Sequence, residues 1–400
     1  MTYKVLICDD APNLSADWAR RIRAVAPAER FTICEPPTNE ETAEGIRALI
    51  RRRNAIRSGS APSREPCLFD GIDILIVDYD LLHIDEEKAR YTGEGVARLA
   101  RTFADTGVIV VLNQYPESQF DLGLRGHLIS HADLNIDAAL LETPGLWSAP
   151  PWQGFRPWAW ESLGEAADRQ ARRAKALVDG GLGQSIAKTI GLTADDAARL
   201  SDGAFGFIAP DAQTFVDLEV QTFATFLAGT TEGKDAHALL ETDPQGAARF
   251  AAARISKWLE RDLLGPQDVL VDIPHLLQRF PFLVPGDLSD PQAWNAAIHD
   301  ETGLRAVLPG DVWFAAEGWL SRPAVWWRRL EVDPDIRKRR TEFDYSKAPD
   351  LAFLEDVSCF CPLDEATEFR SGFHNAYDRR FAKVVEGIRY APQRRFAFGG

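Results

Sequence analysis

Short continuous apolar runs alternate with helix-spaced apolar stripes over the first 145 residues of the chain. Continuous runs are typical of strands buried on both faces, and they lie at residues 4–8, 31–34, 72–77, 108–112 and within 128–136. Helical spacing lies between them, at residues 14–25, 40–57 and 95–103. Strands that alternate with helices predict an α/β fold with a five-stranded parallel sheet and helices on both faces.

The pattern changes after residue 145. Residues 146–160 hold three prolines and four tryptophans without periodicity, and we interpret them as an ordered connector whose aromatic rings pack against one or both of the flanking domains. Helical patterns dominate from residue 161 to 400, most clearly at 243–264, where Asp243 can cap a helix and Pro244 suits its first turn.

The sequence therefore predicts three parts: an α/β domain at 1–145, the connector, and a mainly α-helical domain with a few short strands at 161–400. Within the last part, residues 363–385 are predicted to be helical, and residues 269–271 and 389–398 are predicted to be strands.

The negative charge is spread along the chain. The formal net charge is −15, and residues 1–145 contribute −7 of it, from 23 acidic and 16 basic side chains. A nucleic-acid-binding protein usually carries a basic domain, so this distribution argues against a nucleic-acid partner. No apolar run is long enough to cross a bilayer, and the first residues lack a signal-peptide pattern, so we expect a cytoplasmic protein without membrane insertion.

Three carboxylates stand at the ends of predicted strands. Asp9 and Asp10 follow the first strand, and Asp78 follows the third. Ligands of an open parallel sheet bind beyond the carboxyl ends of its strands, so we expect these side chains to converge. Crowded carboxylates repel one another, and a hard cation such as Mg²⁺ relieves that repulsion. The sequence therefore predicts a magnesium site at this edge.

The motifs KVLICDD, DILIVDYDLL, EGVARLAR and VIVVLN resemble the receiver domain of two-component response regulators, over roughly the first 140 residues. The resemblance implies a flavodoxin-like sheet. It also implies that Asp78 is the phospho-accepting aspartate, that Asp9 and Asp10 hold Mg²⁺, and that Asp80 offers its backbone carbonyl to the metal. Phosphoryl transfer needs mainly positioning and charge neutralisation, which this set supplies.

Two positions depart from the receiver pattern. A receiver ends its fourth strand in Thr or Ser, which follows the phosphoryl group, whereas this chain has Asn113 there. A receiver also places a Lys after its fifth strand, but residues 89–174 contain no Lys; by spacing Asn135 takes that place, or Ser130 or His131 if the strand lies earlier. We therefore expect weak coupling between Asp78 and the rest of the domain, and a domain that acts mainly as a docking platform.

Three classes of function remain open. The favoured one is a signalling protein that acts with a histidine kinase or another signalling protein, and whose C-terminal domain binds a partner protein or a second copy of the chain. The second is a receiver-controlled hydrolase or nuclease. The third is a transcription regulator with a helix-turn-helix near residues 184–200. In that hairpin Asp195 and Asp196 would face the phosphates, so an ordinary hairpin capped by Thr193 is favoured.

Smaller acidic and basic groups are weaker signals. Asp272 with His275, and Asp217 with Glu219, have the spacing of fragments of a metal or hydrolase site. Two residues are too few to define either, and such pairs are usually capping or surface groups. The basic run at 337–340 is more often a solvated helix face than a phosphate clamp.

Overall fold

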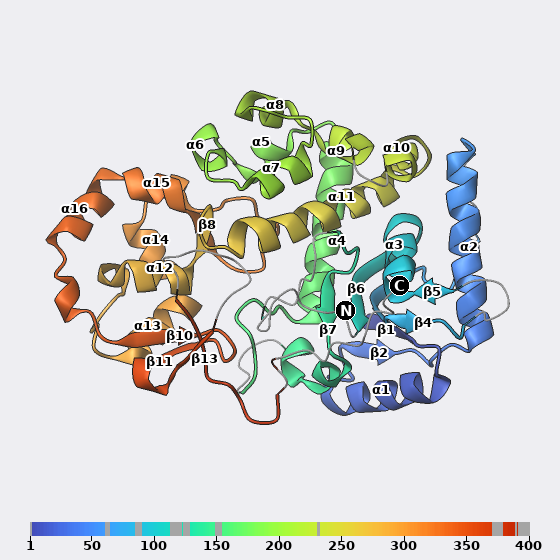
Figure 1. Ribbon diagram of the computed structural model, residues 1–400, viewed down its shortest axis with the longest axis horizontal. Helices are drawn as coiled ribbons and strands as arrows, with labels where there is room; N and C mark the ends of the chain where they lie inside the picture. Colours follow the sequence, from blue (N-terminus) through green and yellow to red (C-terminus); the bar gives the residue numbers. More distant parts are fainter. Residues whose placement is uncertain are drawn as a thin grey trace, which may run out of the picture.

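The structure is a computed structural model that describes residues 2–60, 65–84, 90–112, 122, 129–148, 154–229, 233–369, 379–388 and 390. A five-stranded parallel sheet with strand order β2-β1-β3-β6-β7 forms its amino-terminal part (Figure 1). Its strands are β1 (Tyr3–Cys8), β2 (Phe31–Ile33), β3 (Ile72–Val77), β6 (Thr106–Leu112) and β7 (Leu134–Ile136). The predicted α/β class with a five-stranded parallel sheet is therefore confirmed.

Helices cover both faces of this sheet. Successive residues of a strand point to opposite faces, so Val5 and Ile7 join one hydrophobic cluster while Leu6 and Cys8 join another. The elements over the first cluster are α1 (Pro12–Val25), η1 (Ala138–Glu142) and η2 (Pro144–Leu146), and those over the second are α2 (Asn39–Arg57) and α3 (Gly93–Phe103). Both clusters are continuous with residues from the second half of the chain.

Side-chain caps fix where two of these helices begin. Thr38 and Glu41 form a reciprocal capping box at the start of α2. The hydroxyl of Thr92 accepts a hydrogen bond from the Gly95 backbone amide at 3.1 Å, so α3 begins at Gly93, two residues before the predicted start. The sequence analysis overlooked this threonine cap, and the correction adds Gly93 and Glu94 to the helix that follows the acidic edge.

Two long helices from later in the chain pack against the sheet and its helices. Helix α4 (Leu163–Gly180) lies against β3 and β6, and α11 (Pro244–Trp258) packs against α3 and α4. The Gln170 side-chain amide of α4 donates a hydrogen bond to the Gly107 carbonyl of β6 at 3.1 Å. As predicted, Asp243 caps α11 and Pro244 opens it, and a π-helical turn at Leu259–Leu264 continues the helix. The sheet and these helices share one hydrophobic core.

This shared core leads us to expect that a fragment of residues 1–145 melts without cooperativity and binds a hydrophobic dye, because the faces covered by α4 and α11 would be exposed. Thermal melting and dye fluorescence measure both effects. A fragment of residues 1–180, which restores α4, should recover part of the cooperativity. A monomeric, cooperatively melting 1–145 fragment would instead support the boundary predicted at residue 145.

The connector packs its aromatic rings as predicted. Trp147, Phe155 and Trp160 are buried in the same cluster as β1, and the Trp147 indole donates to the Leu141 carbonyl at 2.9 Å. Trp158 lies further along and points toward the C-terminal elements. The described aromatic residues of the connector therefore pack into the protein core, while Trp152 lies outside the described residues.

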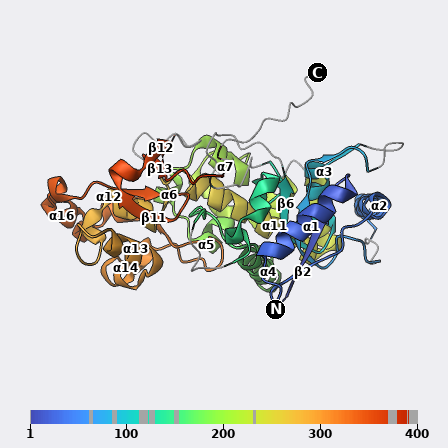
Figure 2. The same cartoon turned by 90° about the horizontal axis from the view of Figure 1, so that it is seen from below.

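The molecule is elongated, and helices α12 to α16 with strands β10 to β13 form the end opposite the parallel sheet (Figures 1 and 2). The further helices are α5 (Ile186–Ile190), α6 (Ala194–Ala197), α7 (Asp202–Ile208), α8 (Phe215–Val220), α9 (Phe223–Gly229), α10 (Gly233–Thr242), α12 (Ile273–Arg279), α13 (Pro291–His299), α14 (Thr302–Val307), α15 (Trp327–Val332) and α16 (Pro334–Glu342). The further strands are β4 (Asp80–Leu81), β5 (Tyr91–Thr92), β8 (Leu270–Asp272), β9 (Ala324–Trp326), β10 (Leu351–Leu354), β11 (Cys359–Pro362), β12 (Thr367–Phe369) and β13 (Arg380–Ala382). Strands β10 to β13 form a four-stranded sheet with order β11-β10-β13-β12.

That sheet corrects one prediction. Residues 363–385 were expected to be helical, but their described part contains a short 3₁₀ turn and strands β12 and β13. Strand β13 pairs in parallel with β10 and antiparallel with β12, so tertiary pairing overrides the local helical spacing. Of the strand predicted at 389–398, all but residue 390 lies outside the described residues.

Long helices are present, but none in the described part of the chain is both long and apolar enough to cross a membrane.

Candidate functional site

The carboxylates predicted to converge lie at the carboxyl ends of adjacent central strands. Asp9 and Asp10 follow β1, and Asp78 follows β3. The Asp78 backbone amide donates a hydrogen bond to the Cys8 carbonyl at 2.9 Å, which continues the parallel pairing to the strand ends. We call Asp9, Asp10 and Asp78 the acidic edge.

Asp9 and Asp78 are the buried members of the acidic edge, and Asp9 is the less exposed of the two. Only 3% of the Asp9 surface is exposed. One oxygen, Oδ1, accepts a hydrogen bond from the Ala11 amide at 2.7 Å, while Oδ2 is buried without a hydrogen-bond partner among the described residues. Burial raises the pKa of Asp9 from 3.8 to about 7, and the charges of Asp78 and Asp10 raise it further against the Ala11 hydrogen bond. At neutral pH this position therefore favours a proton or a cation.

The other carboxylates bind the backbone of the loop that follows β3. Asp10 Oδ2 accepts a hydrogen bond from the His83 amide at 2.9 Å, and Asp78 Oδ2 accepts one from the Asp80 amide at 3.0 Å. Asp80 itself accepts from the Leu82 amide at 3.3 Å. These contacts hold Asp10 and Asp78 in place beside the buried carboxylate.

The acidic edge offers the oxygen donors of a magnesium site, but its side chains are not arranged around one metal position. Oxygen ligands and an unpartnered Asp9 Oδ2 suit a hard cation. Within the described ranges, however, no group of three or more His, Cys, Asp or Glu side chains is positioned to hold a metal ion. Magnesium binding by Asp9, Asp10, Asp78 and Asp80 therefore stays a prediction. Asn113, the residue at the Thr/Ser position, lies outside the described residues.

Gly93 joins α3 to the acidic edge. Its amide donates to the Tyr79 carbonyl at 2.8 Å. A Cβ atom at this position would lie 2.3 Å from the Asp78 carbonyl oxygen, so only glycine allows this approach. The first turn of α3 thus rests directly on the backbone of the predicted phospho-acceptor.

Glu94, the next residue, binds Ser130, His131 and Asn135, which are the residues at which a receiver would carry its Lys. Its Oε1 accepts hydrogen bonds from the Ser130 hydroxyl and, at 3.2 Å, from the Asn135 amide; its Oε2 accepts from the His131 backbone at 3.3 Å. Ser130, His131 and Asn135 are all buried. A carboxylate therefore faces these three residues.

Two cations reach the same segment from α11. Lys257 Nζ donates to the carbonyls of Ser130 and Ala132 at 3.2 and 2.9 Å, and Arg254 Nη1 donates to the Ser130 carbonyl at 2.9 Å. Lys257 is only 4% exposed. Burial and the charge of Arg254 lower the pKa of Lys257 to about 7, although Glu94 and Asp133 oppose that change. Neither residue was predicted from the sequence, where the available signal was a pair of cations in the mainly apolar second half of α11.

Asp272 and His275 meet as their spacing suggested, in a buried ionic cluster. Asp272 Oδ1 lies 2.5 Å from His275 Nδ1, and Asp272 Oδ2 lies 2.9 Å from Arg322 Nε. On the other side of the imidazole, His275 Nε2 lies 3.5 Å from Glu355 Oε1, and Glu355 also pairs with Arg380. Carboxylates on both sides favour a charged imidazolium, so this arrangement is that of a structural cluster rather than a general base.

The other motifs have structural roles. Asp217 forms a capping box with Thr214 on the surface. In the helical hairpin near residues 184–200, Thr193 caps α6 as predicted, and α6 has only four residues. Asp196 is buried and pairs with Arg329 at 2.6 Å, so this hairpin presents no helix long enough to enter a groove of DNA.

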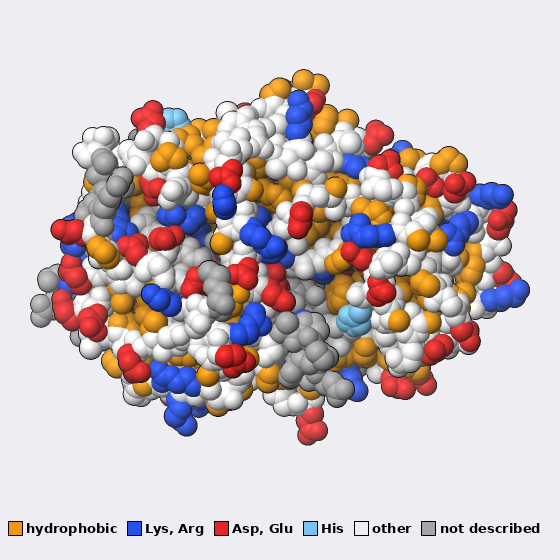
Figure 3. All heavy atoms as spheres, turned by 180° about the vertical axis from the view of Figure 1, so that it is seen from behind, with side chains coloured by type: hydrophobic (Ala, Val, Ile, Leu, Met, Phe, Trp, Pro, Cys, Tyr) orange, Lys and Arg blue, Asp and Glu red, His pale blue; other side chains and the backbone are white. Residues whose placement is uncertain are grey.

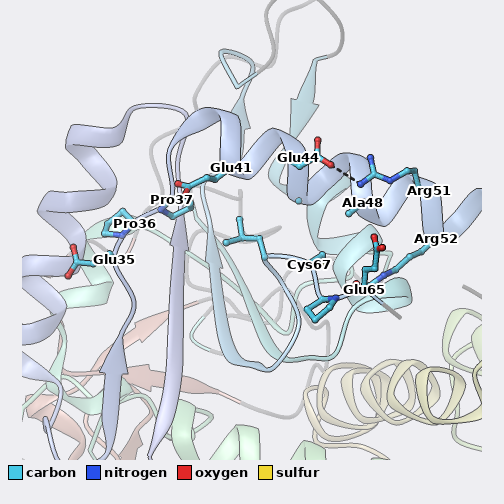
Figure 4. Close-up of a pocket in the computed structure, with 13 residues that line it drawn as sticks. Glu35, Pro36, Pro37, Glu41, Glu44, Ala48, Arg51, Arg52, Glu65 and Cys67 are labelled. Carbon is cyan, nitrogen blue, oxygen red and sulfur yellow. Dashed lines mark hydrogen bonds and ion pairs between the residues drawn. The ribbon is translucent and has the colours of Figure 1, made fainter. Parts of the chain in front are cut away.

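Figure 4 shows a pocket of about 560 Å³ between α2, the loop that precedes it and residues 65–68. Its charged walls are largely paired within the protein: Arg51 binds Glu44, and Arg52 binds Asp70 and the Glu65 carbonyl. On the face drawn in Figure 3, acidic and basic side chains are interspersed rather than gathered by sign. Neither feature selects a ligand class.

Comparisons with known proteins add no relative: no family model, no curated protein and no solved structure matches the chain. Any functional assignment therefore rests on the residues and the geometry described above.

Proposed function

We propose that the protein is a cytosolic signal-transduction protein whose residues 1–145 form an atypical, flavodoxin-like receiver domain. In this proposal Asp78 accepts a phosphoryl group, Asp9 and Asp10 hold Mg²⁺, and residues 161–400 bind a partner protein. The strand order β2-β1-β3-β6-β7 supports it. The observation that carries it is the buried Asp9, with its unpartnered oxygen and raised pKa, beside Asp78 at the carboxyl edge of that sheet.

In this proposal each residue at the acidic edge has a separate role. Asp78 supplies the nucleophile: one carboxylate oxygen bonds to phosphorus while the donor's leaving group departs with the bonding electron pair. Mg²⁺ supplies charge neutralisation when it is bound. Asp9 loses its proton to the solvent when the cation arrives, and the amides of Asp80 and His83 orient Asp78 and Asp10.

The alternatives receive no support from a specific observation. The buried, fully paired cluster around Asp272 offers no open position for a hydrolytic water, and the short α6 does not favour a DNA reader. A histidine kinase or another signalling protein remains the partner that the proposal implies at Asp78, and the proposed output is docking to a protein or to a second copy of the chain.

The test is treatment of the full chain with Mg²⁺ and a small phosphodonor such as acetyl phosphate. We expect a phosphoryl adduct on Asp78, detected by peptide mass spectrometry, at sub-stoichiometric occupancy, because the cations described beside β7, Lys257 and Arg254, already bind backbone carbonyls there. The adduct should be absent from Asp78→Asn. It should persist in the matched control Asp73→Asn, since Asp73 lies at the other end of β3 and binds the Lys4 amide. An unmodified Asp78 at saturating donor would contradict the proposal.

A further inference from the structure

A continuous chain of buried and partly buried contacts leads from the acidic edge to α11. The Asp78 carbonyl rests against Gly93. Glu94 then binds Ser130 and Asn135, and Lys257 binds the Ser130 carbonyl. Each step links a different element, namely β3, α3, the segment before β7, and α11.

Burial makes each of these contacts costly to leave unsatisfied. Ser130, Asn135, Arg254 and Lys257 are all buried, and a buried polar group that loses its partner destabilises the structure by about 1–3 kcal/mol, more if it is charged. Asn135 Oδ1 already has no hydrogen-bond partner among the described residues. Glu94 itself is half-buried, but the partners that it holds are buried, so a displacement of its carboxylate leaves them without their hydrogen-bond acceptor.

The geometry points to a coupling route in which occupancy of the acidic edge is transmitted through Glu94 to Lys257 and Arg254 of α11. We name Gly93, Glu94, Ser130 and Lys257 the relay. It rests on the proposed function, since a ligand at the acidic edge is its input. The relay runs within the chain, so the first partner of the receiver-like sheet is the second half of the same protein.

Two features explain why the relay would respond to charge. A cation at the acidic edge changes the charge beside the Asp78 backbone. Because Gly93 packs closely against the Asp78 carbonyl, a displacement of this backbone also displaces the start of α3. At the far end, the charged groups that influence Lys257 are Arg254, Glu94, Asp133 and Arg261. Lys257 is therefore sensitive to where the Glu94 carboxylate lies.

This route differs from the one that Asn113 and the absent Lys would serve. The sequence analysis expected weak coupling because those two groups are unsuited to following a phosphoryl group. The relay uses neither: its carboxylate comes from α3 and its cations come from α11, more than a hundred residues beyond β7. The ring of His131 adds a contact to α11, 5.7 Å from that of Phe250 between centroids.

The experiment measures hydrogen exchange of the full chain with and without Mg²⁺ as the only ligand, while calorimetry reports Mg²⁺ binding. In the parent protein we expect Mg²⁺ to change exchange of peptides that cover residues 129–136 and 250–258 by roughly fivefold or more. Glu94→Gln and Lys257→Met should still bind Mg²⁺ and should lose the change at 250–258. Ser130→Ala is a milder break in the relay, in case either variant fails to fold.

Ser256→Ala is the matched control, because Ser256 lies beside Lys257 but its hydroxyl faces the Trp319 carbonyl. It should respond to Mg²⁺ like the parent. Mg²⁺ binding without any change at 129–136 and 250–258 would overturn the relay alone. An equal response in Ser130→Ala, Lys257→Met and the control would also overturn it. Absence of Mg²⁺ binding to the parent would overturn the proposed magnesium site, and the relay with it.

Discussion

Replacement of Asp272 by asparagine is expected to lower the free energy of unfolding by about 3–5 kcal/mol, because a buried ion pair that loses one member leaves the other charges uncompensated. Asp272 is fully buried. It contacts His275 and Arg322, and its Oδ2 also accepts hydrogen bonds from the Trp158 indole and the Gln267 amide, both at 3.1 Å. One substitution therefore disturbs the connector, β8 and α12 together.

Urea unfolding followed by tryptophan fluorescence measures this effect. The matched control is Asp17→Asn, which removes a carboxylate that pairs with Arg20 and Arg21 on the solvent side of α1; its stability should stay close to that of the parent. A loss in Asp272→Asn no larger than in this control would show that the cluster contributes little to stability.

The difference in the free energy of unfolding between the parent protein and Asp272→Asn should depend on pH, because folding changes the pKa values of His275, Asp272 and Glu355. Burial opposes the charged forms of all three groups. At His275 the carboxylates of Asp272 and Glu355 outweigh burial and the charge of Arg380, so its pKa is raised. At the carboxylates the contacts with His275 and the arginines outweigh burial, so the pKa of Asp272 is lowered and that of Glu355 is lowered to about 2. The contribution of His275 to stability is complete below the ordinary pKa of histidine, and it is lost as the pH rises through the higher pKa that His275 has in the folded protein. The contributions of the carboxylates are complete above their ordinary values and are lost in acid. The stability advantage over Asp272→Asn should therefore be largest between pH 4.5 and 6.5.

Asp9→Asn should act in the opposite direction and stabilise the metal-free protein at pH 8. Because the folded pKa of Asp9 lies at about 7, above its ordinary 3.8, stability is lost as the pH rises through this interval. The difference corresponds to about 4 kcal/mol as an upper bound. Asparagine avoids the buried charge, so the gain should be absent at pH 4 and present at pH 8.

Thermal melting at the two pH values, with and without Mg²⁺, checks this expectation. In the parent protein Mg²⁺ should raise the melting temperature, because it binds the folded state, and Asp9→Asn combined with Asp10→Asn should abolish that rise. Asp73→Asn, at the opposite end of β3, is the control and should show no gain at pH 8. A destabilised Asp9→Asn at pH 8 would mean that the carboxylate is needed by the fold itself.

Local patterns in the sequence predicted the sheet well and the candidate site in part. Strand β3 was placed correctly to the residue because a short, mainly apolar run with polar residues on both sides is typical of a buried strand, and the acidic edge followed from where such strands end. The cations beside β7 could not be predicted. Spacing along the sequence finds only neighbouring residues, whereas Lys257 reaches the segment before β7 through packing of α11 on α3. The strands at 367–369 and 380–382 were missed because they are stabilised by pairing with each other and with β10, which local helical spacing does not reveal.

The packing of α11 against α3 sets an order of events during synthesis. The last residues of β6 precede the end of α11 by 146 positions, and ribosomes add about 5–20 residues per second, so the apolar surface of α3 that α11 covers waits roughly 7 to 30 s after β6 has been made. Uncovered apolar surface on a nascent chain is what chaperones bind, so α3 is the element that we expect them to contact before α11 emerges.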